Sequence, residues 1–168
     1  MDEAIESIAK QVECTMNRHV AYHEAGHAVM AVLNSCTVTA VSITERQTYI
    51  DSKPLEDILA SAETSAADEE YLLEDVKIAM AGFLSEQLCL GVAYPNLGSD
   101  LTRMNAMLRR IPNRGGRGLE LQQEVTDSLK SHKEAIVRLA ETLLVEKDMT
   151  GERARAVLQL PAVGDASA

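Results

Sequence analysis

Apolar residues recur along most of the chain at intervals of three or four, which is the spacing that places side chains on one face of a helix. One short stretch differs, because "TVTAVSIT" (37–44) is β-branched and alternating, as a strand is. The ten residues after it fit either an irregular connection or a weak second strand. The pattern predicts helices over residues 5–12, 17–33, 55–62, 69–90, 101–111, 119–143 and 151–158.

Residues that favour helix ends set the expected boundaries of these elements. Asn17 and Thr150 are expected as N-caps, and either Ser99 or Asp100 is expected to cap the helix that follows the loop at 92–100. Gly91 should end the long central helix. The glycine-rich segment "PNRGGRG" (112–118) is predicted to be a flexible break.

These elements predict a mainly α fold with one small β element. A chain of 168 residues is enough for one globular domain, and aromatic residues make up 3% of it, with no Trp and a single Phe. The core must therefore consist of aliphatic residues and Met, which favours helices. We expect an N-terminal helical extension over residues 1–16, one domain over 17–160 and a disordered tail over 161–168.

The net charge of -10 argues against nucleic-acid binding and against binding to anionic membranes. Eight carboxylates and no basic residue lie within 56–75, which indicates a solvated acidic face. No apolar run approaches the roughly 20 residues that span a bilayer. Three cysteines without CxxC spacing suggest reduced, buried thiols, so the chain is expected to be cytoplasmic. They are Cys14, Cys36 and Cys89.

The strongest chemical signal is the HExxH motif in "AYHEAGHAVMAVL" (21–33). Four residues make just over one helical turn, so His23 and His27 leave the same face and can hold one tetrahedral zinc ion. Glu24 then lies beside the metal as a general base for a water molecule. Gly26 lies inside the predicted helix, where glycine costs about 1 kcal/mol relative to alanine. We attribute it to close approach of another backbone, such as a strand edge.

A catalytic zinc site needs a third protein ligand, and the metzincin pattern of a further Gly and His downstream is absent. His19 shares the helix face of His23 and His27, but it would lie too far along the helix axis to bind the same ion. His132 sits in an amphipathic segment and is expected at the surface. Glu86, in the middle of a predicted helix, and Asp100, after a glycine-containing loop, remain as candidates.

The sequence resembles the peptidase domain of the FtsH-type ATP-dependent zinc proteases. "AYHEAGHAVMAVL" is similar to the zinc helix of that family, and "VTAVSIT" to the strand that follows it. "IAMAGFLSEQLCLG" resembles its Gly-Gly-Arg-x-Ala-Glu-Glu helix, "LGSDLTRMNAML" its Gly-Ala-x-x-Asp-Leu segment, and "AIVRLAETLLVEKDMTGERARAVL" its C-terminal helices. These collinear matches cover roughly residues 17–160.

The resemblance implies a zincin-like fold with His23, His27 and Asp100 as zinc ligands and Glu24 as the catalytic base. Glu86 then matches a structural helix position. The strand near residues 38–43 is expected beside the cleft, where an extended substrate can pair with it.

The sequence also departs from the family. It contains no Walker A motif and no transmembrane segment, and "AGFLSEQ" and "NLGSD" replace the usual motifs. We therefore expect a stand-alone zinc metalloendopeptidase, a hydrolase that acts on unfolded or flexible polypeptides. The alternative is a zinc-binding interaction or regulatory domain with little or no proteolytic activity. A separate ATPase or adaptor is a possible partner, and an oligomer is also possible.

Overall fold

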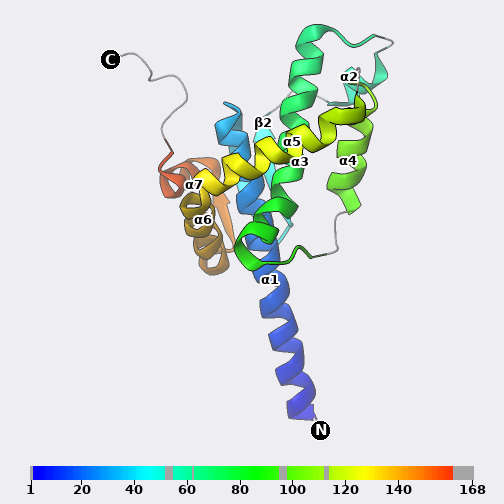
Figure 1. Cartoon of the computed structure of the whole chain (residues 1–168). Coiled ribbons are helices and arrows are strands. Elements are labelled where there is room, and N and C mark those ends of the chain that lie inside the picture. The colour runs from blue at the N-terminus through cyan, green and yellow to red at the C-terminus, as the bar shows by residue number, and fades with distance from the viewer. Residues whose placement is uncertain (1, 52–54, 62, 95–97, 112–113, 161–168) are drawn as a thin grey trace.

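The computed structural model describes residues 2–51, 55–61, 63–94, 98–111 and 114–160 (Figure 1). Within these residues the fold is mainly helical with one three-stranded antiparallel sheet, as the sequence predicts. The helices are α1 (Asp2–Leu33), α2 (Leu55–Ala60), α3 (Ala66–Leu90), α4 (Gly98–Leu108), α5 (Arg114–Ser131), α6 (Lys133–Glu146) and α7 (Gly151–Leu158). The strands are β1 (Thr37–Ser42), β2 (Gln47–Asp51) and β3 (Asp148–Thr150).

The core forms where the second half of α1 packs against α3 and α6. Small residues let α1 and α3 approach closely, and Gly26 marks the tightest point. A Cβ atom added to Gly26 would lie 2.4 Å from both the Ala81 carbonyl oxygen and the Ser85 Oγ. The expected close approach of a backbone is confirmed, but the neighbour is helix α3 and not a strand edge.

Helix α1 is continuous, so the expected break at Asn17 is wrong. No proline or glycine lies within residues 2–25, so nothing stops the helix at Asn17. The first half of α1 projects from the body of the molecule (Figure 1), and residues 4–15 are all exposed. Ile5, Ile8 and Val12 therefore lie on an exposed face and contribute nothing to the core.

The strand order of the sheet is β2-β1-β3. β1 pairs with β2 on one side and with β3 on the other, where Val41 lies opposite Met149. The expectation that an extended substrate pairs with β1 beside the cleft is therefore wrong, because β2 and β3 occupy its two edges and residues 46–50, not 37–42, line the cleft. β2, which the sequence left as a connection or a weak strand, is a strand at the end of the sheet.

The ends of α3 and α7 follow their capping residues. Gly91 ends α3 in the left-handed conformation, and the Thr150 hydroxyl accepts a hydrogen bond from the Arg153 backbone N–H at the start of α7. Ser99 and Asp100 are not caps, since α4 already begins at Gly98. Asp100 thus lies in the first turn of α4, with its side chain free to point elsewhere.

The C-terminal half corrects two further expectations. Residues 114–118 are the first turns of α5 and not a flexible break, while 112–113 and the predicted tail at 161–168 lie outside the described residues. The predicted final long helix is two helices, α5 and α6, which are divided at His132. Residues on both sides of that point are buried, which explains why their spacing reads as one pattern.

The three cysteines are free thiols that differ in exposure. Cys14 is exposed, contrary to expectation, whereas Cys36 and Cys89 are partly buried. Cys14 is exposed because it lies on the projecting half of α1.

None of the described helices combines the length and apolar character that crossing a membrane requires.

Candidate metal centre

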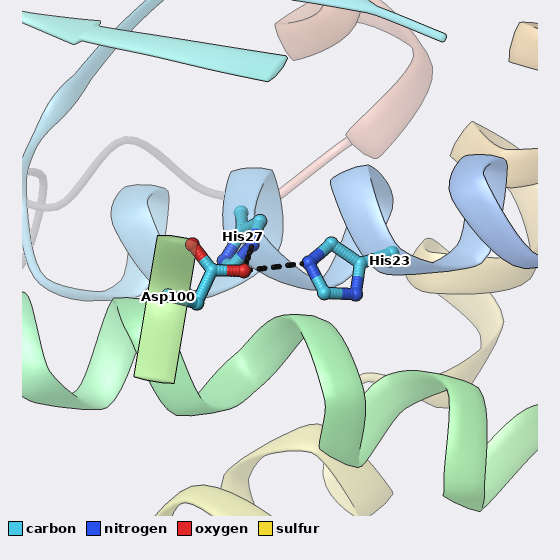
Figure 2. A group of neighbouring side chains, drawn as sticks. All are labelled: His23, His27 and Asp100. Carbon is cyan, nitrogen blue, oxygen red and sulfur yellow. Dashed lines mark hydrogen bonds and ion pairs between the residues drawn. The ribbon is translucent and has the colours of Figure 1, made fainter. Parts of the chain in front are cut away.

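The two histidines of the HExxH motif meet Asp100 in a group of three (Figure 2). The Nε2 atom of His23 lies 2.8 Å from Asp100 Oδ2, and the Nε2 atom of His27 lies 3.3 Å from the same oxygen. The ligand atoms of all three residues lie within 4.8 Å of one another. Among the described residues, this is the group of His, Cys, Asp and Glu side chains whose spacing suits a metal ion.

Two observations show that this group fits zinc. Zinc binds imidazole nitrogens and carboxylate oxygens. In a tetrahedral site each ligand atom lies about 2.0–2.1 Å from the ion, and the distances that this geometry produces between ligand atoms are close to those between the three residues here. The second observation is Gly82 on α3. A Cβ atom added at Gly82 would lie 2.6 Å from the Nε2 atoms of both His23 and His27. Glycine therefore keeps open the space beside the two ligand nitrogens.

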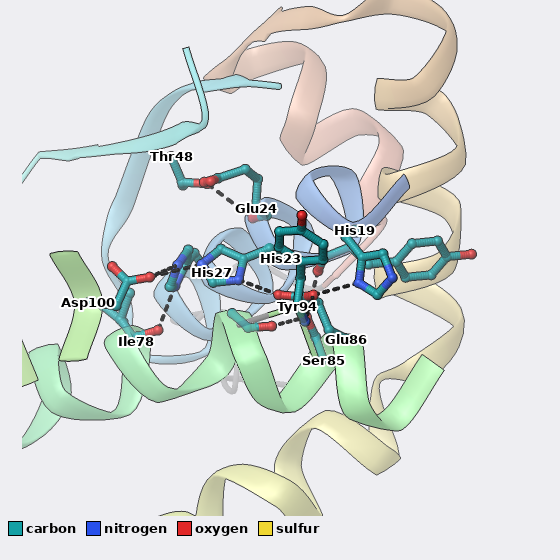
Figure 3. Close-up of polar contacts among 12 residues, drawn as sticks. His19, His23, Glu24, His27, Thr48, Ile78, Ser85, Glu86, Tyr94 and Asp100 are labelled. Carbon is teal, nitrogen blue, oxygen red and sulfur yellow. Dashed lines mark hydrogen bonds and ion pairs between the residues drawn. The ribbon is translucent and has the colours of Figure 1, made fainter. Parts of the chain in front are cut away.

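The other nitrogen of each imidazole bonds to the protein (Figure 3). His27 Nδ1 donates to the Ile78 carbonyl oxygen at 2.7 Å, and His23 Nδ1 donates to Glu86 Oε1 at 2.7 Å. Such partners select the tautomer and orient the ring, and they leave each Nε2 atom facing Asp100 and available to a metal ion. The sequence left Glu86 as a candidate ligand and the family resemblance implied a structural position, since nothing local to α3 reveals that its side chain faces a histidine of α1.

Glu86 is almost fully buried, and its carboxylate accepts from three donors. Besides His23, these are the His19 Nδ1 at 2.7 Å and the Tyr94 backbone N–H at 2.8 Å, both on Oε2. Glu86 is oriented toward the outer side of His23 and is not among the three grouped residues. His132 belongs neither to this group nor to the lining of the cleft, and its Nδ1 donates to the Ser128 carbonyl oxygen at 2.8 Å.

The charges of the cluster favour a cation. Burial opposes protonation of His23, but hydrogen bonds to Asp100 and Glu86 together with the charge of Glu24 outweigh it and raise the pKa of His23 to about 10. Burial likewise opposes ionisation of Asp100, but hydrogen bonds from the two histidines hold its pKa well below the ordinary value. The surrounding carboxylates thus attract positive charge, and a divalent ion can take the place of a proton.

Glu24 lies on the same turn of α1, in a cleft of about 540 Å³ that the three grouped residues also line. Burial is the main cause that raises the pKa of Glu24, although the nearby histidines oppose it. The Thr48 hydroxyl lies 2.9 Å from Glu24 Oε2 and 3.0 Å from the Glu24 carbonyl oxygen. Because Thr48 belongs to β2, this contact places the end strand of the sheet along the cleft.

An ion pair positions α4, the helix that carries Asp100. Arg103 donates to both carboxylate oxygens of the buried Asp75 on α3, at 2.7–3.0 Å. A bidentate pair of this kind defines orientation as well as distance. It holds the first turn of α4 against α3, so that Asp100 faces the histidines of α1.

Comparison with known proteins finds a matching family and several relatives. The model of peptidase family M41 matches residues 10–116. The "ATP-dependent zinc metalloprotease FtsH" of Borreliella burgdorferi (strain ZS7) is 23% identical over 215 residues, which cover 98% of this chain and 33% of that protein. "ATP-dependent zinc metalloprotease FtsH 3" of Conexibacter woesei is 30% identical over 104 residues, 59% of this chain and 13% of that protein.

A third relative, the FtsH of Lactococcus lactis subsp. lactis (strain IL1403), is 29% identical over 129 residues, 72% of this chain and 18% of that protein. The chain therefore spans a third or less of the length of these relatives. The family match, in contrast, covers more than half of the chain and includes the HExxH helix, α3 and α4. On that match, this chain belongs to peptidase family M41.

Proposed function

We propose that this chain is a zinc-dependent metalloendopeptidase that cleaves unfolded or flexible polypeptides. The observation that carries the proposal is the position of Glu24. It lies beside the group formed by His23, His27 and Asp100, and all four residues line one cleft. A zinc site that served only structure would not require a buried carboxylate at this place.

In this proposal His23, His27 and Asp100 hold the ion. Zinc supplies Lewis acidity, which lets a water molecule lose a proton near neutral pH and polarises a carbonyl group. Glu24 accepts that proton and later returns it to the leaving amine. The raised pKa of Glu24 suits this work, because a base must also be able to act as an acid. The Thr48 hydroxyl holds one carboxylate oxygen in place.

The substrate class follows from β2. Its outer edge is not paired within the described part of the sheet, and residues 46–50 line the cleft. An extended polypeptide can add to such an edge through main-chain hydrogen bonds. A segment bound there would pass Thr48 and so bring its peptide bonds to Glu24. Folded proteins present few extended segments, so unfolded or flexible chains are the expected substrates.

The test compares metal content and cleavage of casein, an unfolded substrate, between the wild type and Glu24→Gln. We expect about one zinc per chain in both proteins, and cleavage lost only in the variant, because Gln cannot accept the proton. Glu120→Gln is the matched control, since it makes the same change on the exposed face of α5 and should leave cleavage unaltered.

Two other outcomes would contradict the proposal. Zinc in both proteins with cleavage in neither would favour a zinc-binding interaction or regulatory domain without proteolysis. Failure of the wild type to retain zinc after purification from zinc-supplemented medium would reject both functions.

A further inference from the structure

His19 lies one turn before His23 on the same face of α1, and the proposed chemistry does not use it. Its Nδ1 atom lies 2.7 Å from Glu86 Oε2, while the Nδ1 atom of His23 lies 2.7 Å from Glu86 Oε1 (Figure 3). One buried carboxylate thus joins two histidines of a single helix. His19 is not part of the three-residue group that could hold a metal.

We propose that His19 is a positioning residue for the zinc site, which acts through Glu86 to orient the ligand His23. The inference rests on the proposed function, since it needs a zinc ion at His23, His27 and Asp100. His19 lies outside the HExxH motif, and its removal should weaken zinc binding without removing a ligand.

Hydrogen bonds hold both carboxylate oxygens of Glu86. A carboxylate can rotate about its terminal bond, and only its outer contacts stop it from doing so. Oε1 accepts from His23, so the orientation of the group depends on what holds Oε2. His19 supplies one of the two donors on Oε2, and the Tyr94 backbone N–H supplies the other. Without His19, one of these two contacts is lost.

The side chains of Glu86 and His19 are both largely buried. The Glu86 side chain is 3% exposed and that of His19 is 13% exposed, so water has little access to replace the lost donor. Oε2 would then be held by the Tyr94 backbone N–H alone. Loss of a hydrogen bond to a buried charged group is costly, so Glu86 would turn to share its remaining donors. Such a turn would lengthen the bond to His23 Nδ1, which selects the tautomer that presents Nε2 to the metal.

His19 also makes an aromatic contact with Tyr94. Its ring centroid lies 5.6 Å from that of Tyr94, whose backbone N–H also bonds to Glu86. His19 therefore contacts both the carboxylate and the residue that shares it. This arrangement fixes the imidazole of His19 as well, so the donor is preorganised and does not have to be recruited when metal binds.

The experiment measures zinc affinity by competition with a chromophoric chelator, which does not depend on activity. We compare the wild type with His19→Leu, which lacks the donor, and with His19→Asn, whose amide nitrogen can occupy the place of Nδ1. Loss of a partner of a ligating histidine costs about 10- to 100-fold in affinity. For His19→Leu, which acts one contact further out, we expect roughly the lower limit. His19→Asn should recover most of this loss.

Two controls separate positioning from a general structural effect. His132→Leu makes the same change at a partly buried histidine outside the cleft and should leave zinc affinity unaltered. In a Glu86→Gln background, His19→Leu should add little to the loss, since residues that act through one network are not additive. If His19→Leu fails to fold by circular dichroism, His19→Gln replaces it, because its longer side chain moves the donor away from Nδ1.

Three results would overturn the inference while the zinc site itself stands. They are unchanged zinc affinity in His19→Leu, equal losses in His19→Asn and His19→Leu, and full additivity with Glu86→Gln. A raised KM for casein with unchanged zinc affinity would instead make His19 a wall of the substrate cleft. A wild type that binds no zinc would reject the proposed function, which distinguishes that failure from the others.

Discussion

At the scale of single residues, the site depends on how each imidazole divides its two nitrogens. His23 and His27 use Nδ1 for a bond to the protein and turn Nε2 toward Asp100. The bonds at Nδ1 go to different acceptors, a buried carboxylate for His23 and a backbone carbonyl for His27. The protein thus orients one imidazole through a side chain and the other through the backbone of α3.

This division predicts different results for the two carboxylates near His23. Glu86→Gln should weaken zinc binding by about 10- to 100-fold, because it disturbs the orientation of a ligand but removes none. Asp100→Ala should weaken it by more than roughly 100-fold, since the expected third ligand is lost. Chelator competition measures both values. Equal losses, or a larger loss for Glu86→Gln, would contradict the proposed ligand set.

Gly82 permits a second test, which changes no polar group. Gly82→Ala should abolish or strongly weaken zinc binding, because the new methyl group would lie 2.6 Å from both Nε2 atoms. Gly118→Ala is the matched control in α5, where nothing lies within 4 Å of the added Cβ atom. That change should preserve zinc binding and stabilise the helix by up to about 1 kcal/mol. Full zinc affinity in Gly82→Ala would show that the ligands approach the metal from another side.

At the scale of elements, three helices and one strand converge on the cleft. α1 carries the histidines and Glu24, α3 carries Glu86 and Gly82, α4 carries Asp100, and β2 brings Thr48 to Glu24. α4 is the shortest of these helices, and most of its contacts are with α3. Its placement, and hence that of Asp100, depends strongly on the Arg103–Asp75 pair.

We therefore predict that Arg103→Met both destabilises the protein and weakens zinc binding. The change leaves the buried Asp75 carboxylate without its partner, which costs about 1–3 kcal/mol in the free energy of unfolding. Arg103→Lys should be intermediate, because it keeps the charge but not the bidentate geometry. Denaturant unfolding and chelator competition measure the two effects. A stability loss without any change in zinc affinity would show that the pair does not position Asp100.

At the scale of the whole molecule, a helical body carries the core and the site, and the first half of α1 extends beyond it (Figure 1). The core residues begin at Ala21 and end at Leu158. The family match begins at residue 10, within the projecting part of α1. The body therefore contains every residue that the proposed function uses.

Deletion of residues 1–11 should accordingly leave zinc affinity unchanged and shift the unfolding temperature by no more than about 2 °C. Calorimetry of the metal-free protein measures the shift. A chain that stops at Met149 is the contrasting control, because it loses α7 and the buried Leu158, and it should be strongly destabilised. A comparable drop for the N-terminal deletion would show that the projecting helix packs against the body.

Local patterns in the sequence were sufficient for most of the helical segments and for part of the site. Helical periodicity is a property of neighbouring residues, so the sequence alone places His23, Glu24 and His27 together on one turn. The caps at Gly91 and Thr150 are local for the same reason and are confirmed. The division of α5 from α6 was missed, because buried residues continue at helical spacing across His132.

Only the tertiary structure decided which distant residues meet that turn. From the residues alone, Glu86 and Asp100 both remained candidates, and the family resemblance chose between them. Packing of α3 and α4 on α1 places Asp100 at the Nε2 atoms and Glu86 at the Nδ1 atom of His23. The strand order, which puts β2 and not β1 along the cleft, is likewise set by a pairing with β3 about 110 residues away in sequence. Contacts of this range leave no periodic signal in the chain, because they depend on how whole elements pack.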